Sequence, residues 1–173
     1  MSGRLIGFPN PVNELAARTV AGVVMVMSAV LLALSVGLGH AWLWGSAGLA
    51  YGFVARVLTG PTLSPLGRFS MNVVAPRLGE PRHVAGPPKR FAQGIGAGVT
   101  LTAVVLLALG HPFGTQVLLG MLIIAAGLES ILGYCIGCKI FAVLMQLGWI
   151  PEETCEACNN IALRAPTPAA ERI

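Results

Sequence analysis

Charged side chains are scarce in this sequence. Only 10% of its 173 residues are charged, against roughly 25% in an average soluble domain. Hydrophobic residues make up 55% of the chain, and the mean hydropathy is +0.76. A soluble domain of this size would need more polar surface than the chain can supply. The composition therefore argues against an ordinary soluble domain and favours an all-α, polytopic membrane protein.

Two binding signatures are also missing. The 11 Lys and Arg residues lie between apolar runs, without the interleaved aromatic residues that single-strand binders use. No glycine-rich nucleotide-binding pattern occurs between a strand and a helix, because the GIGAG run at 94–98 lies inside an apolar segment. We therefore expect the lipid bilayer, and no nucleic acid, as a partner.

Long apolar runs are present instead. A membrane-spanning helix needs about 20 such residues, and the first run is longer than the apolar region of a signal peptide, so we expect it to be retained. Residues 1–150 are predicted to form a membrane helical domain, and residues 151–173 a cytoplasmic tail. Within that domain the predicted spans are about 17–38, 41–58, 91–109 and 115–137, with a cytoplasmic loop at 59–90.

The fourth apolar run is too long for one straight helix across a membrane. It stays apolar from Thr115 to Ile150, which would be about 50 Å of helix at 1.5 Å per residue. The hydrocarbon core is only about 30 Å thick. The run must therefore tilt, protrude or break, and Gly133 and Gly137 are the weakest points. Residues 139–149 would continue as a protruding or interfacial segment.

The basic residues indicate an orientation. They flank the predicted spans at one side only, whereas the short turns near His40 and His111 contain none. Lys and Arg are enriched in cytoplasmic loops. The sequence therefore predicts a multi-pass protein of the cytoplasmic (inner) membrane, with both termini and the central loop facing the cytoplasm. The loop's basic residues are interpreted as setting this topology.

All four cysteines occur in two CxxC pairs, Cys135 with Cys138 and Cys155 with Cys158. A reducing cytosol disfavours permanent disulfides, so the pairs are interpreted as cycling thiols or metal ligands. Sixteen residues separate the pairs, a spacing that suits a site in which all four thiolates bind zinc. If the residues between the pairs form a helix, that helix carries the chain away from Cys138. Only a few residues then remain to bring Cys155 back to the first pair, so the chain would have to be almost fully extended for all four thiolates to bind one zinc ion.

The redox interpretation needs no such closure. Cys135 and Cys138 would share a helical face if the helix continues. Lys139 would favour a thiolate next to it, and a thiolate attacks a disulfide or a sulfane sulfur. The tail pair would then exchange with the membrane pair.

Glu129 is the one acidic residue well inside a predicted span. An intramembrane carboxyl group is a functional candidate by default, so a role as proton carrier is one hypothesis. The other is a packing carboxyl that bonds to a hydroxyl such as that of Thr100 or Thr102. Six residues before Cys135, Glu129 would lie on roughly the opposite face of a continuous helix.

Three motifs occur in order, SPLGRF at 64–69, GPPKRFAQGIG at 86–96 and GYCIGCKIF at 133–141. Together they resemble domain-of-unknown-function family 4395. The resemblance covers about residues 10–149 and implies a small, bacterial, multi-pass membrane domain. It also implies an association with thioredoxin-like or rhodanese-like sulfur proteins. Cys135 and Cys138 fit the family pattern, whereas Cys155 and Cys158 do not match it.

Three functions stay open at this point. The first is thiol-disulfide or sulfane-sulfur chemistry with a thioredoxin-like or rhodanese-like partner, as an oxidoreductase or a sulfur-transfer component. The second is a non-enzymatic membrane module with a four-cysteine zinc site. The third is a small transporter of a sulfur compound, which would have to form a homo-oligomer because four spans make a small pore.

Overall fold

The computed structural model describes residues 12–61, 63–77, 79 and 83–151. This part of the chain is almost entirely helical, which confirms the all-α class. One two-residue strand pair, β1 (Val12–Asn13) with β2 (His83–Val84), ties the start of the first helix to the start of the fourth. The helices are α1 (Glu14–Gly37), η1 (His40–Gly45), α2 (Ser46–Thr59), α3 (Pro65–Phe69), η2 (Ser70–Val74), η3 (Ala75–Arg77), α4 (Gly86–Ala108), α5 (Pro112–Leu132) and α6 (Ile136–Gln146).

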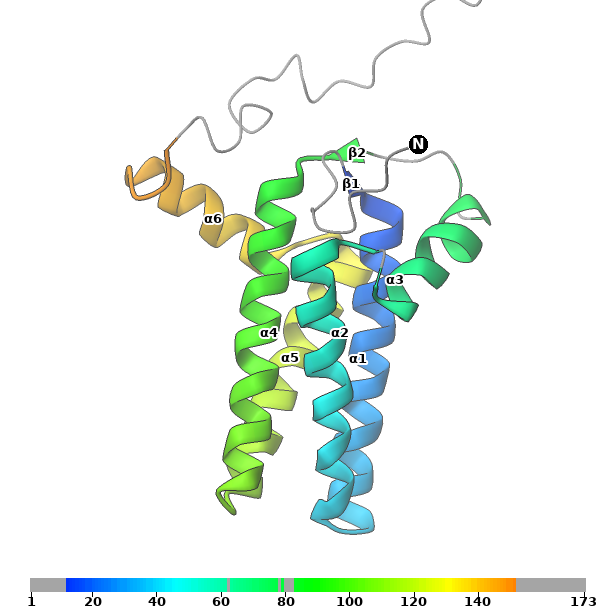
Figure 1. Cartoon of the computed structure of the whole chain (residues 1–173), viewed down its shortest axis with the longest axis vertical. Helices are drawn as coiled ribbons and strands as arrows, with labels where there is room; N and C mark the ends of the chain where they lie inside the picture. Colours follow the sequence, from blue (N-terminus) through cyan, green and yellow to red (C-terminus); the bar gives the residue numbers. More distant parts are fainter. Residues whose placement is uncertain (1–11, 62, 78, 80–82, 152–173) are drawn as a thin grey trace, which may run out of the picture.

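Four helices, α1, α2, α4 and α5, run side by side as a bundle, and α6 leaves the bundle at one end (Figure 1). α1 packs on α5, and α4 packs on both α2 and α5. The bundle core is built around Val24, Leu43, Leu119 and Phe53, which are buried. Many other large apolar side chains point outward, such as Ile124 at 65% exposure. An apolar exterior of this kind suits contact with lipid.

Three helices, α1, α4 and α5, are long and apolar enough to cross a membrane. They correspond to the first, third and fourth predicted spans. The second predicted span is different, because α2 has only 14 residues. α2 is directly preceded by η1, a six-residue 3₁₀-helix. Ser46, the residue after η1, has α-helical backbone angles and is the first residue of α2, so the two helices are continuous.

The long apolar run breaks after α5, as its length predicted. α5 ends at Gly133, which has a φ of +69°, a conformation that glycine adopts without steric cost. The N–H of Gly133 donates to the carbonyl of Glu129, the bond of an αL C-cap, and the N–H of Tyr134 donates to the carbonyl of Leu128. The chain then turns, and α6 begins after Cys135.

Gly137 was predicted as the other weak point, but no break occurs there. It lies inside α6 and is buried. A Cβ atom at this position would lie 2.6 Å from the Cα of Ala92. The missing side chain therefore lets α6 lie directly against α4, and this packing continues in the tilted ring contact between Phe91 and Phe141, 5.6 Å between centroids.

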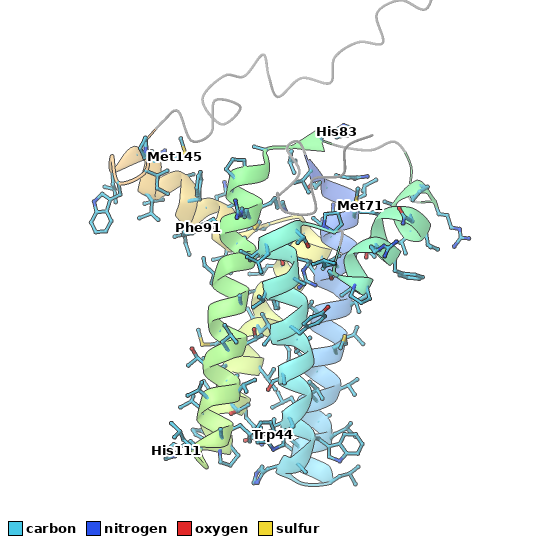
Figure 2. The ribbon with its side chains drawn as sticks, viewed as in Figure 1. Trp44, Met71, His83, Phe91, His111 and Met145 are labelled. Carbon is cyan, nitrogen blue, oxygen red and sulfur yellow. The ribbon has the colours of Figure 1, made fainter. Side chains whose placement is uncertain are left out.

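The charged residues gather at one end of the bundle. Residues 19–55 and 91–128 contain no Asp, Glu, Lys or Arg. These stretches include the turns at Trp44 and His111, which lie at the end opposite His83 and Met71 (Figure 2). All charged side chains in the described part of the chain are thus confined to the end from which α6 emerges.

Two of these basic residues also bind the carbonyl ends of helices. The Arg18 guanidinium donates to the carbonyls of Ser130 and Ile131 at distances of 2.8–3.2 Å. Arg90 donates to the carbonyl of Val57 at 3.1 Å. The last carbonyls of a helix have no partner within the helix, and a cation there also complements the helix dipole. The sequence analysis interpreted the basic residues of the loop only as setting the topology. It missed that such residues also bind the carbonyl groups at helix ends.

The predicted loop at 59–90 is partly helical. α3, η2 and η3 follow one another from Pro65 to Arg77. At the other end the prediction was wrong, because α4 begins at Gly86 and not near Phe91. Proline fits the first turn of a helix, where its missing N–H has no partner to lose. Lys89 and Arg90 therefore belong to α4 and not to a loop.

Candidate functional site

A buried ion pair lies where α4, α5 and α6 meet. The Nζ of Lys89, in the first turn of α4, lies 2.7 Å from the Oε1 of Glu129 in the last turn of α5. The two side chains are only 9% and 14% exposed. Removing two charges from water is costly, and their attraction offsets that cost only when the pair is close and well aligned. The pair therefore fixes the relative position of α4 and α5 at this end of the bundle.

This pairing corrects the hydrogen-bond partners expected for Glu129. The Thr100 hydroxyl donates to the carbonyls of Gly96 and Ala97, and the Thr102 hydroxyl donates to the carbonyl of Gly98. Both threonines thus bond within α4, as hydroxyls commonly do inside helices. The carboxylate of Glu129 pairs instead with Lys89, a residue that the sequence interpretation had placed outside the spans.

The first cysteine pair lies at the start of α6. Cys135 is the N-cap residue of this helix and is buried, whereas Cys138 lies in the first turn and is half-buried. Both thiols are free. The two residues are therefore brought together by the beginning of a new helix, and not by the continuous helix face that the sequence suggested.

The two thiols differ in acidity. A hydrogen bond from the Cys138 thiol lowers the pKa of Cys135, and the positive charge of Lys89 acts in the same direction, whereas burial and the Glu129 carboxylate oppose the shift without reversing it. The same hydrogen bond, together with burial, raises the pKa of Cys138. Cys135 is thus the thiol that ionises first, and the neutral Cys138 acts as its hydrogen-bond donor. A thiolate is the nucleophilic form of cysteine.

The cation that favours the thiolate is Lys89. Lys139 was expected to play this part because it follows Cys138 in sequence. In the structure Lys139 is exposed, and its Nζ lies over the ring of Tyr134, 5.6 Å from the ring centroid.

A cavity of about 480 Å³ connects the ion pair to the thiol. Both Glu129 and Cys135 line it, so the turn at Gly133 brings them to the same cavity although a continuous helix would have separated them. Most of the other lining residues are apolar and come from all four bundle helices and α6, among them Val24, Phe53 and Met121. The thiol therefore faces an apolar space with one charged end.

Cys155 and Cys158 lie outside the described residues. Among the residues that are described, no group of three or more His, Cys, Asp or Glu side chains could hold a metal ion. Cys135 and Cys138 could supply two thiolate ligands, which is half of a tetrahedral zinc site. The expected four-cysteine zinc site therefore stays a prediction.

Sequence reasoning missed Lys89, Arg56 and Gln93 as members of this end of the bundle. Arg56 is buried in α2, and its Nε donates to the Oε1 of Gln93 in α4 at 2.8 Å. A usable signal existed for Lys89, since Gly-Pro-Pro at 86–88 marks the start of a helix and places Lys89 within it. For Arg56 the signal was its position inside the second apolar run, two residues before the end of the predicted span at residue 58.

We predict that Cys135 is alkylated at lower pH than an ordinary thiol. In a chain with Cys155 and Cys158 replaced by alanine, the pH midpoint of Cys135 alkylation should lie below about 8.5, the usual thiol pKa. Replacing Cys138 by alanine removes the hydrogen-bond donor, so the midpoint should rise. Mass spectrometry after timed exposure to iodoacetamide gives the rate at each residue. An unchanged or lower midpoint in the Cys138→Ala variant would contradict the assignment.

The fold and the site define a class, an all-α protein with three helices able to cross a membrane and a buried ion pair beside a CxxC motif. The profile of one family, named for a domain of unknown function (DUF4395), matches residues 12–146. The chain belongs to this family, which confirms the resemblance found in its three motifs. No curated protein and no solved structure matches the chain.

Proposed function

We propose that this protein carries out thiol-disulfide or sulfane-sulfur chemistry at the cytoplasmic side of the bacterial inner membrane. Four spans are proposed, with η1 and α2 together forming the second. At about 2.0 Å per residue for a 3₁₀-helix and 1.5 Å for an α-helix, these 20 residues extend about 33 Å, enough for the hydrocarbon core. The confinement of all described Lys and Arg residues to one end supports cytoplasmic termini.

The position of Cys135 carries the proposal. Cys135 is the N-cap residue of α6, its thiol accepts a hydrogen bond from the Cys138 thiol, and the residue lines a cavity that Glu129 also lines. A CxxC pair with one acidified and one neutral thiol is what disulfide exchange requires, because one sulfur must attack and the other must resolve. A merely structural pair needs neither the asymmetry nor the cavity.

In the disulfide reaction, the Cys135 thiolate attacks one sulfur of a partner's disulfide, and the other sulfur leaves as a thiolate that takes up a proton. Cys138 then loses its proton, attacks the mixed disulfide and releases the partner's second thiol. The partner has gained two electrons and two protons, and Cys135 and Cys138 are oxidised to a disulfide. Glu129, which lines the same cavity as Cys135, is proposed to carry the proton of Cys138 to the leaving sulfur of the partner.

Sulfur transfer would use the same first step. The Cys135 thiolate attacks the outer sulfur of a persulfide donor, a Cys135 persulfide forms, and the donor leaves as its thiol after protonation. No net oxidation is needed. A soluble thioredoxin-like or rhodanese-like protein is the proposed partner, in keeping with what the family resemblance implies.

The test is the redox behaviour of the pair. In protein lacking Cys155 and Cys158, a Cys135–Cys138 disulfide should form and break reversibly in glutathione buffers, with a midpoint of about −180 to −270 mV. Mass spectrometry of the alkylated protein measures the fraction oxidised. A pair that stays reduced under oxidising conditions, or that binds one zinc per chain in the intact protein, would contradict the proposal.

A further inference from the structure

Arg56 is a buried cation with few partners. The residue is only 6% exposed, and a guanidinium has five N–H donors. Its Nε donates to Gln93, its Nη1 donates to the Ser64 hydroxyl at 3.3 Å, and the group lies over the Phe53 ring, 4.6 Å from the centroid. Gly52, one helical turn earlier, leaves room for the Nη1 atom. Within the described part of the chain, none of these partners carries a negative charge.

The charges at this end do not balance. Two buried cations, Arg56 and Lys89, share one nearby carboxylate, that of Glu129, and this carboxylate is already bonded to Lys89. The other acidic residue that the structure describes, Glu14, forms no ion pair. Buried charges in proteins are normally paired. Among the residues that the structure describes, one positive charge therefore remains without a counter-ion.

Both cations line a second cavity, of about 80 Å³, between α1, α2 and α4. This space is well above the 10–15 Å³ that one water molecule needs. Two amide side chains, Asn13 and Gln93, also line it. Their oxygens already accept hydrogen bonds, Asn13 from the N–H of Leu15 and Gln93 from Arg56. Each amide therefore has its NH₂ group left to offer, and the polar lining presents N–H donors.

We propose that this cavity binds a compact inorganic anion, held by Arg56 and Lys89 with the two amides. A cavity that combines two cations, N–H donors and apolar walls is matched to an anion and to no cation. The ligand class includes a halide and a small sulfur anion such as thiosulfate. Lys89 would link this site to the cavity that holds Cys135, because it bonds to Glu129. The proposal does not depend on the thiol chemistry.

Anion binding can be measured on the full-length protein in lipid nanodiscs. The temperature of unfolding should rise saturably with chloride or with thiosulfate when gluconate keeps the ionic strength constant. Arg56→Gln should weaken the apparent affinity by about tenfold or more, because it removes a charged donor. Arg56→Lys should keep most of the affinity, and Arg68→Gln, at an exposed position of α3, should leave it unchanged.

The Glu129→Gln substitution is expected to change the anion affinity in the opposite direction. Removing the one carboxylate near the two cations should raise the anion affinity, although the same variant loses the ion pair. Tighter binding of thiosulfate than of chloride would identify a sulfur anion as the ligand, and the reverse order a halide. If Arg56→Gln does not fold, anomalous scattering from bromide in crystals of the unaltered protein locates the anion directly. An absence of saturable binding, or binding that neither the Arg56→Gln nor the Glu129→Gln variant changes, would overturn the proposal.

Discussion

Replacing Lys89 by methionine is expected to destabilise the protein by about 3–5 kcal/mol, because it leaves the Glu129 carboxylate buried without its partner. The side chain of Glu129 is only 14% exposed, so water cannot fully replace the ammonium group. Methionine has a similar length and fills the same space. The decrease in the free energy of unfolding would therefore come from the lost positive charge and not from a cavity. Equilibrium unfolding by a denaturing detergent in mixed micelles gives the free energy of unfolding.

Two controls separate the ion pair from other causes. Lys139→Met makes the same change at an exposed position and should alter the free energy of unfolding by no more than about 0.5 kcal/mol. The double variant Lys89→Met with Glu129→Gln should recover a large part of the loss, because no unpaired charge remains. A double variant as unstable as Lys89→Met would show that the loss comes from packing.

The second large effect is expected at Gly137. An alanine there would place its Cβ 2.6 Å from both the Cα and the Cβ of Ala92, and backbone atoms cannot move aside as a flexible side chain can. We expect α6 to separate from α4, at a cost of about 1–3 kcal/mol. Because Gly137 lies between the two cysteines, Cys135 should also lose its acidity. Unfolding and the pH dependence of alkylation measure the two consequences.

The matched control is the same substitution at Gly120, in α5. A Cβ there meets no atom within 4 Å, and alanine favours a helix over glycine by roughly 0.5–1 kcal/mol. Gly120→Ala should therefore be neutral or stabilising. Equal destabilisation by the two alanines would mean that close packing of α6 on α4 does not hold the cysteine pair in place.

Much of the fold could be predicted from apolar length alone. The break after α5 followed from comparing about 50 Å of possible helix with a hydrocarbon core of about 30 Å, and Gly133 was the residue best able to adopt a positive φ. The start of α4 was misplaced for a different reason. The predicted span began with the apolar run at residue 91, whereas Pro87 and Pro88 already lie in the first turn of α4, a position that tolerates proline.

The candidate site was only half predictable. Its cysteines were recognisable from their spacing, and Glu129 from its place in an apolar run. Their mutual arrangement was not, since Glu129 and Cys135 lie apart on a continuous helix and line one cavity only because the chain turns between them. The activating cation was assigned to Lys139 by sequence proximity, whereas Lys89 reaches the site from another helix.

The sequence by itself determined the helical class, the family, the long apolar spans and the confinement of charge to one end, because each depends on composition and order along the chain. Only the tertiary structure decided which charges meet. Lys89 and Glu129 are 40 residues apart, and their pairing, like the burial of Arg56, depends on how α2, α4 and α5 pack. Burial strengthens electrostatic interactions between such groups, and no local pattern in the sequence specifies that burial.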